Sequence, residues 1–100
     1  TLVEFTCRSI ARALEASQPH ASEVYVCGGG AHNSCIMDRL GDILAPATVA
    51  STAAIGIDPD WVEAATFGWL AQQALAGLPG NNPAVTGAKG MRILGGIYPG

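Results

Sequence analysis

Three consecutive glycines, Gly28 to Gly30, follow a short β-branched segment and precede a helical pattern. Because glycine has no Cβ, such a run lets the backbone approach a ligand closely, and amides at a helix N-terminus favour anionic groups. The run is not a P-loop, since no Gly-Lys-Ser/Thr follows it, and Asn33 stands where the dinucleotide fingerprint needs its third glycine. The pattern is typical both of a ligand-binding loop and of a tight strand-to-helix turn. Asn33 is likewise a candidate helix cap, a candidate ligand contact, or both.

Glu63 is the second candidate for chemistry. At about 100° per residue along a helix, Glu63 shares one stripe with Phe67, Leu70 and Ala74. No other ionisable residue follows Asp60 before that helical pattern ends. An unpaired carboxylate is costly to bury, so such a group has a shifted pKa, takes a partner from elsewhere, or faces a cleft. The alternative is an acid of the first turn, which the helix dipole stabilises without any further role.

A metal site can be drawn from Cys27, His32 and Cys35, with Cys7 or His20 as a fourth ligand. The spacing does not favour it, because the paired Cys-x-x-Cys pattern is missing and structural zinc takes four well-placed ligands. The cysteines are odd in number and irregularly spaced, which argues against a disulfide framework and for a reducing cytoplasm. We therefore expect free cysteines that act as small buried hydrophobes, and no metal.

Two further polar residues lie near glycines. His32 directly follows the glycine run and Lys89 lies in a glycine-rich loop, so each could contact a ligand, Lys89 as a phosphate partner. A solvated or locally bonded side chain is the simpler expectation for both. Trp61 and Trp69 are expected to anchor packing.

The composition excludes several classes of protein. The 100 residues are 49% apolar and 13% charged, whereas roughly 25% of an average domain is charged, so the chain is not disordered. The net charge of −3 leaves no basic surplus for nucleic acid, and no polybasic stretch suits a membrane surface. No apolar run approaches the ~20 residues of a spanning helix.

The chain opens with Thr1 and carries more apolar residues than so small a domain can bury. We therefore expect a piece of a longer polypeptide, in which a neighbouring part covers the exposed apolar surface.

The first half of the chain reads as helix, strand, helix, strand. An amphipathic pattern predicts a helix from Leu2 to near Ser17. The apolar, β-branched segment Glu23–Cys27 is typical of a buried parallel strand. A second helix begins near Ser34 and closes at Pro46, and Thr48–Ala50 is a second short strand.

The second half predicts one helix and one strand. Asp58 can cap a helix whose first position is Pro59, and this helix runs to about Ala76. Glycines, prolines and asparagines then break the chain, and Met91–Ile97 reads as a last strand. The order α-β-α-β-α-β predicts an α/β fold of three layers with a mostly parallel sheet.

Five motifs, in order and with matching spacing, make the chain resemble the C-terminal portion of the anhydro-N-acetylmuramic acid kinase family, from about Leu2 to Pro99. They are Val26–Asn33 (VCGGGAHN), Gly56–Ala64 (GIDPDWVEA), Leu78–Asn81 (LPGN), Val85–Ala88 (VTGA) and Leu94–Pro99 (LGGIYP). The family belongs to the superfamily of sugar kinases, acetate kinase and actin. The resemblance implies two ribonuclease-H-like α/β domains with ATP between them, of which residues 1–100 would be the C-terminal part of the second, nucleotide-binding domain.

The resemblance also implies a reaction and its residues. With ATP and Mg²⁺, the family phosphorylates the 6-oxygen of 1,6-anhydro-N-acetylmuramic acid while water opens the anhydro bridge, which yields N-acetylmuramic acid 6-phosphate for cell-wall (peptidoglycan) recycling. By position, Gly28, Gly29, Gly30 and Asn33 match the adenosine motif, and Glu63 matches an acid at the sugar end of the cleft. A carboxylate there could orient the water or stabilise charge at the anomeric carbon. The resemblance further suggests a homodimer.

Parts of the family pattern are absent from the chain. The Gly/Ser-rich phosphate loop and the second phosphate motif, with its general-base aspartate, have no counterpart here. We therefore expect the chain alone to be inactive and the N-terminal part of the same polypeptide to complete the site. Two other classes stay open: a stand-alone, non-catalytic nucleotide-binding module, and a purely structural or oligomerisation domain.

Overall fold

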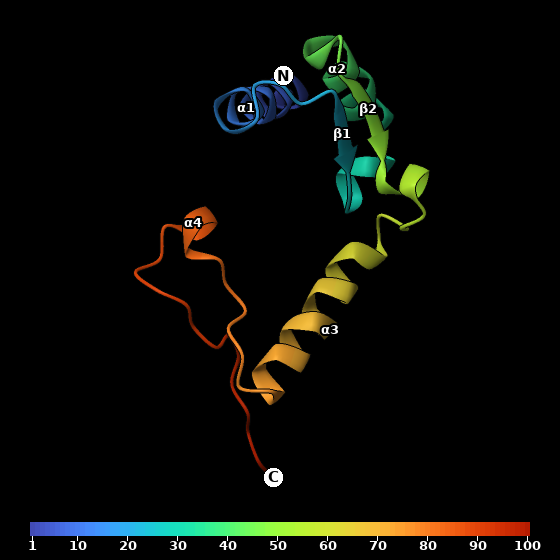
Figure 1. Ribbon diagram of the computed structural model, residues 1–100. Helices are drawn as coiled ribbons and strands as arrows, with labels where there is room; N and C mark the ends of the chain where they lie inside the picture. The colour runs from blue at the N-terminus through green and yellow to red at the C-terminus, as the bar shows by residue number, and fades with distance from the viewer. The chain divides into compact units, whose positions relative to one another are not determined.

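The computed structural model describes residues 1–100, which divide into two units, Thr1–Val62 and Glu63–Gly100. Figure 1 shows the elements of both, and each unit is described by itself. The predicted α/β class is confirmed, and the alternation of helix and strand is confirmed through the third long helix.

Two parallel strands form the sheet of the first unit. Strand β1 (Glu23–Val26) pairs with β2 (Thr48–Ser51), so that Val26 lies opposite Ser51 at the last register position. Helix α2 (Ser34–Leu44) makes the crossover between them, as a parallel pair requires. Both strands are short and rich in β-branched and small residues, which suits a parallel pair. The predicted burial of the strand at Glu23–Cys27 is wrong within this chain, because its residues are exposed or half-buried. Their carboxyl ends share one edge, and the glycine run leaves the sheet there.

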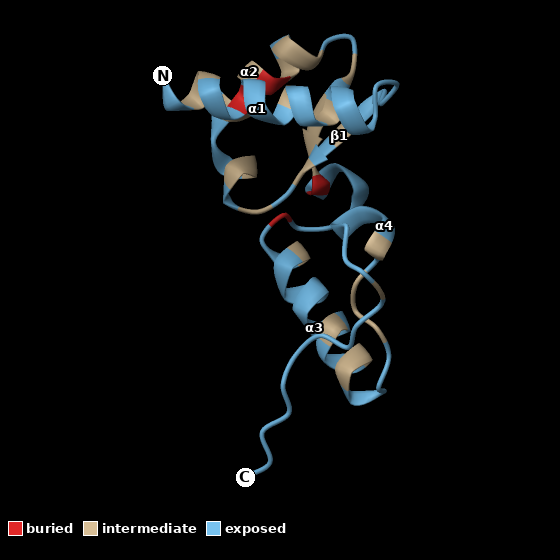
Figure 2. Cartoon of the chain, turned by 90° about the vertical axis from the view of Figure 1, so that its left-hand side faces the viewer, coloured by how far each residue is buried: buried red, intermediate tan, exposed pale blue.

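Helix α1 (Leu2–Ser17) packs against α2 and closes the small core of the first unit. Thr1 caps α1, because its hydroxyl accepts the Glu4 amide at 3.4 Å. Cys7 on α1 and Leu40 on α2 are the two hydrophobic residues that the chain buries completely. Figure 2 shows buried segments in red where the two helices meet. The core of this unit therefore lies between α1 and α2.

An ion-pair network joins the same two helices at their rim. Glu4 on α1 accepts Arg39 Nε on α2 at 2.6 Å and Nη2 at 2.9 Å, and it also accepts Arg8 Nε at 2.6 Å. Hydrogen bonds from Arg39 and then Arg8 lower the pKa of Glu4 from 4.5 to about 2. The same carboxylate raises the pKa of Arg39.

Helix α3 (Trp61–Leu75) begins two residues later than its sequence predicts. The predicted cap Asp58 uses its side chain in a turn instead, because Oδ1 accepts the Asp60 amide at 2.9 Å. The Asp58 carbonyl accepts the Trp61 amide at 3.0 Å. Pro59 and Asp60 therefore form a turn before the helix, and Pro59 is buried.

Beyond α3, the second unit is a loop closed by polar contacts. The Leu78 amide returns to the Gln73 carbonyl at 2.8 Å, which ends the helix. A single helical turn, α4 (Pro83–Thr86), lies in the segment where the sequence predicts only a break. Arg92 closes the loop, since its carbonyl accepts the Gly80 amide at 3.0 Å and its amide reaches Asn81 Oδ1 at 2.6 Å.

The predicted last strand, Met91–Ile97, is wrong in this structure: the segment forms no strand. The Arg92 amide is taken by a side chain rather than by a neighbouring strand, and Gly95 has a φ of +110°, which breaks extended geometry. The sheet thus has two strands. The predicted three-layer, ribonuclease-H-like arrangement stays a prediction.

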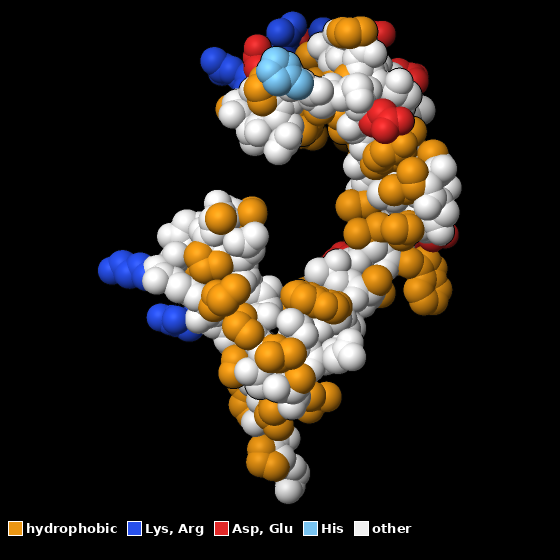
Figure 3. All heavy atoms as spheres, viewed as in Figure 1, with side chains coloured by type: hydrophobic (Ala, Val, Ile, Leu, Met, Phe, Trp, Pro, Cys, Tyr) orange, Lys and Arg blue, Asp and Glu red, His pale blue; other side chains and the backbone are white.

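Many large apolar side chains are exposed, above all on α3 and the C-terminal segment, as the orange atoms in Figure 3 show. Trp61 is 68% exposed and Trp69 is 50% exposed, so the expectation that they anchor packing is wrong within this chain. None of the helices combines the length and apolar character that crossing a bilayer requires.

Candidate functional site

The glycine run lies at the carboxyl edge of the parallel pair, between β1 and α2. Gly28 adopts a φ of +69°, a left-handed conformation that favours glycine. Residues Gly29–His32 then form a 3₁₀ turn (η1), in which the Ala31 amide bonds to the Gly28 carbonyl at 3.1 Å. Gly28 is therefore explained by backbone geometry alone.

Gly29 and Gly30 have no such explanation. Neither has a positive φ, and a Cβ built on either would meet no atom within 4 Å. Gly80 shows the contrast, because its Cβ would lie 2.8 Å from Leu70 Cδ2. Glycine in a helical turn costs about 0.5–1 kcal/mol relative to alanine. Nothing within this chain thus requires glycine at positions 29 and 30.

Asn33 caps α2, as its sequence predicts. Its Oδ1 accepts the Ile36 amide at 3.2 Å, and its backbone is extended, as an N-cap requires. The side chain is exposed at the edge where the strands end. Because the cap uses only the oxygen, the amide nitrogen can still donate to a ligand.

The turn before α3 holds the glycine run at two points. The Gly28 amide donates to the Pro59 carbonyl at 2.9 Å. His32 Nε2 lies 2.7 Å from Asp60 Oδ1, with the two side chains 58% and 61% exposed. Sequence reasoning considered His32 and Asp60 separately and missed their pairing. Both residues follow strands whose carboxyl ends share one edge, which places them in the same region but does not identify them as partners.

Thr52 is a second residue that sequence reasoning missed. It follows β2 directly, one position beyond the Ser51–Val26 pair, and is 8% exposed. Its Oγ1 is buried without a hydrogen-bond partner. A buried hydroxyl without a partner is uncommon, and this one belongs to the same edge as the glycine run.

Glu63 lies in the first turn of α3, where the helix dipole favours an acid. Its side chain is exposed, and Phe67 on the same stripe is 63% exposed. Glu63 belongs to the second unit and the glycine run to the first. The predicted role of Glu63 stays a prediction.

The three cysteines are free. Cys7 is buried and its thiol lies 3.8 Å from the Ile36 carbonyl, as expected for a small hydrophobe. The same expectation is wrong for Cys27 and Cys35, which are exposed because they flank the surface turn of the glycine run. No group of three or more His, Cys, Asp or Glu side chains is arranged to hold a metal ion.

Lys89 is exposed in its loop.

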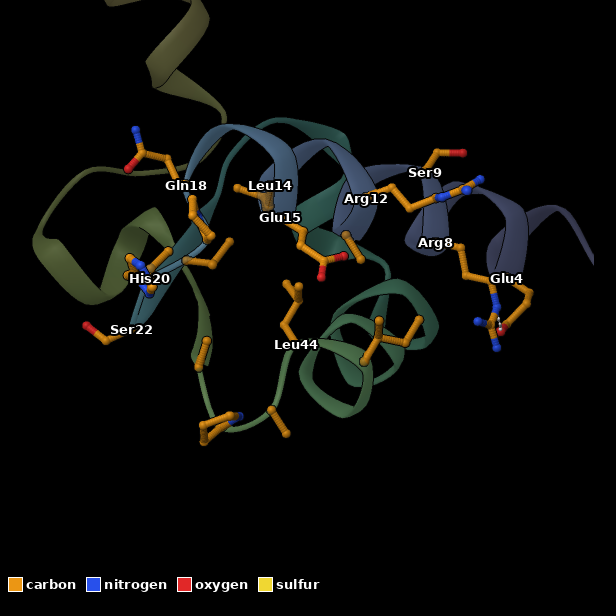
Figure 4. A pocket seen from close by; sticks show the side chains of 18 of the residues that line it. Glu4, Arg8, Ser9, Arg12, Leu14, Glu15, Gln18, His20, Ser22 and Leu44 are labelled. Carbon is orange, nitrogen blue, oxygen red and sulfur yellow. Dashed lines mark hydrogen bonds and ion pairs between the residues drawn. The ribbon is translucent and has the colours of Figure 1, made fainter.

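A large hollow lies elsewhere in the first unit. It has a volume of about 1160 Å³ and is lined by α1, the turn after it and the α2–β2 connection. Figure 4 shows Glu15 and Leu44 facing it from α1 and from the end of α2. This groove lies at the amino ends of the strands, and neither the glycine run nor Asn33 nor Glu63 lines it. Ligands of open α/β sheets bind at the opposite edge, so we give the carboxyl edge precedence over the larger hollow.

A smaller hollow reaches the glycine run. Its volume is about 430 Å³, and Gly30 and Cys27 contribute to its wall together with apolar residues of α1, β1 and α2. The carboxyl edge thus has two glycines with free space where a Cβ would stand, the side-chain amide of Asn33 and an adjoining apolar hollow. These features suit one wall of a ligand site.

A sequence model of the anhydro-N-acetylmuramic acid kinase family matches residues 1–100. The chain belongs to the anhydro-N-acetylmuramic acid kinase family. The resemblance drawn from the five motifs is therefore confirmed.

Comparison with individual proteins supports the same family. The chain is 56% identical over 99 residues to an anhydro-N-acetylmuramic acid kinase of Pseudomonas fluorescens (strain Pf0-1), covering 99% of the chain and 27% of that relative. It is 54% identical to the enzyme of that name from Thiobacillus denitrificans, with the same coverage of both. The counterpart from Nitrosospira multiformis is 50% identical over the same shares. The chain spans about a quarter of the length of these curated relatives.

Proposed function

We propose that the full-length protein is an ATP-dependent kinase that opens and 6-phosphorylates 1,6-anhydro-N-acetylmuramic acid. The observation that carries this proposal is the family match over residues 1–100. In the balanced reaction, the γ-phosphoryl group moves from ATP to the 6-oxygen of the sugar, and water adds to the anomeric carbon as its bond to that oxygen breaks. The products are ADP and N-acetylmuramic acid 6-phosphate, an intermediate of peptidoglycan recycling.

The glycine run supplies the adenosine side of the site in this proposal. Gly29 and Gly30 leave open space where a Cβ would stand, although nothing in the chain needs glycine there. A nucleoside lying against bare backbone explains both facts, because a side chain would occupy its position. Asn33 adds an amide donor beside the run, while its oxygen stays in the helix cap.

Glu63 is the acid that this chain contributes to the sugar side. No other ionisable residue lies on α3, whose other side chains are apolar or neutral. Its carboxylate would orient the attacking water or stabilise positive charge that develops at the anomeric carbon. Either role predicts a loss of turnover when the carboxylate is replaced by an amide of the same shape.

This chain does not bring three or more His, Cys, Asp or Glu side chains together as metal ligands. Kinases hold Mg²⁺ through the phosphates of the nucleotide and a few carboxylates, which would come from the rest of the polypeptide. The general base would come from there too. We therefore propose that this chain alone has no kinase activity and forms the C-terminal part of the second, nucleotide-binding domain.

Location and assembly are parts of the same proposal. A cytoplasmic site of action fits the free thiols and the need for ATP. A homodimer fits the exposed apolar residues of the chain, which the N-terminal part of the polypeptide would cover in part.

A coupled ADP-release assay on the full-length protein tests the proposal. With Mg-ATP and 1,6-anhydro-N-acetylmuramic acid we expect turnover by the wild type, and its loss in Glu63→Gln. Turnover by the wild type with an unaffected Glu63→Gln would keep the activity but return Glu63 to a first-turn acid. ATP binding by this chain alone, with no turnover by the full-length protein, would favour the stand-alone nucleotide-binding module.

A further inference from the structure

The segment Gly28–His32, which contains the glycine run, is joined at both of its ends to two consecutive residues. At its start, the Gly28 amide donates to the Pro59 carbonyl at 2.9 Å. At its end, His32 Nε2 lies 2.7 Å from Asp60 Oδ1. Asp58 Oδ1 in turn accepts the Asp60 amide at 2.9 Å, which holds the turn that presents Asp60. All of these contacts lie within the first unit.

The His32–Asp60 pair contributes little to the stability of the fold. The His32 and Asp60 side chains are 58% and 61% exposed, and exposed pairs of this kind stabilise a fold very little. The pair does, however, bridge 28 residues of sequence. It fixes a segment whose three glycines would otherwise have the most backbone freedom in the chain.

We infer that the His32–Asp60 pair positions the glycine run for nucleotide binding by holding it in its bound conformation before the nucleotide arrives. This inference rests on the proposed function, since it assigns the pair to the adenosine side of that site. The bonds inside the 3₁₀ turn set its internal geometry, and a single attachment at Gly28 would leave the position of its far end to β1 and α2 alone. With two, its conformation is fixed against the turn that leads into α3, and the ordering cost is met during folding rather than on binding.

A hydrogen bond is enough to form this pairing, because it does not require both groups to be charged. A neutral His32 donates to Asp60 Oδ1 when its Nε2 carries the proton. Asp60→Asn keeps an acceptor oxygen at that position, whereas Asp60→Ala removes it. Asp60→Asn should therefore retain the effect that Asp60→Ala loses. Both residues act through the position of the run, so they are positioning residues and not catalytic ones.

The first arm of the test needs no substrate. Amide hydrogen exchange of the peptide covering 27–33 is measured in the full-length protein by mass spectrometry. We expect faster exchange in His32→Ala and Asp60→Ala and near-wild-type exchange in Asp60→Asn. Arg8→Ala is the matched control, because it removes another exposed ion pair, to Glu4 at 2.6 Å, from the same unit. Unchanged exchange in both alanine variants would overturn the inference, whatever the enzyme does.

The second arm measures the consequence for the nucleotide. Freeing the backbone of about one residue corresponds to roughly five- to thirtyfold weaker binding. We expect the dissociation constant of Mg-ATP and its KM to rise by about fivefold or more in the alanine variants, with kcat within about twofold. Faster exchange with unchanged ATP affinity would overturn the inference and leave the pair as a structural contact. A wild type that binds ATP but does not turn over the sugar would instead overturn the proposed function, while the binding comparison still decides the role of the pair.

Discussion

Gly29→Ala and Gly30→Ala separate a nucleotide-binding wall from a tight turn, because the two explanations predict different losses. The free space and the backbone conformation at the two glycines determine how the substitutions change the stability of the protein. A Cβ at either position meets no atom within 4 Å, and neither φ is positive. A glycine-to-alanine change at a position of this kind stabilises a protein by about 0.4–1 kcal/mol, since it reduces the freedom of the unfolded chain.

The effect on the nucleotide has the opposite sign. If adenosine lies against this backbone, each new methyl group occupies space that the nucleoside needs. Overpacking of a fitted contact costs about 1–3 kcal/mol, which corresponds to roughly 5- to 150-fold weaker binding. The two substitutions should therefore keep or raise the free energy of unfolding while they raise the KM for ATP by about tenfold.

The assay pairs denaturant unfolding with ATP kinetics on the full-length protein. Gly41→Ala in α2 is the control, because its Cβ also meets nothing within 4 Å and it lies outside the glycine run. It should stabilise the protein without changing the KM for ATP. The reasoning is refuted if Gly29→Ala and Gly30→Ala bind ATP as the wild type does. Such variants could keep their stability or, as a second possible result, lose it. The second result would mean that protein packs against the glycines.

Three further predictions concern the full-length protein and the chain alone. Because the folded pKa of Glu4 is about 2, below its ordinary 4.5, its stabilising contribution is complete above about pH 4.5 and is lost as the pH falls toward 2. The stability gap between wild type and Glu4→Gln should therefore narrow as the pH falls from about 4.5 toward 2 in urea titrations, and a constant gap would contradict this. Leu40→Ala should lower the free energy of unfolding by about 2–5 kcal/mol, because Leu40 is 1% exposed; an effect no larger than that of an exposed-site control, Leu75→Ala, would argue against the core described here. The chain alone should release no ADP above background with Mg-ATP and sugar, and measurable phosphorylation would refute its proposed incompleteness.

Local patterns predicted the first unit well. The helical spacing of apolar residues predicted the helix Leu2–Ser17, and the β-branched run predicted the strand that begins at Glu23. Both patterns lie within a few neighbouring residues of the sequence. The Asn33 cap was predictable for the same reason, since its bond to Ile36 spans three positions. These features depend on a few adjacent residues, which a single sequence displays completely.

Features that depend on distant partners were not predictable. A strand at Met91–Ile97 needs a neighbouring strand, and here Arg92 bonds to Asn81 instead. The His32–Asp60 pair joins residues 28 positions apart, and spacing alone does not reveal it. Trp61 and Trp69 looked like anchors, but this chain offers no core around α3 to receive them. Placing Glu63 in a site likewise depends on the fold of the complete polypeptide.

The most direct test of the central claim is the mass of the sugar product formed by the full-length protein. After incubation with Mg-ATP and 1,6-anhydro-N-acetylmuramic acid, the account predicts a product heavier by one phosphoryl group and one water, formed in equal amount to ADP. A phosphorylated sugar without the added water would contradict ring opening in the proposed reaction. Unchanged sugar, with a folded and ATP-binding protein, would contradict the proposed substrate.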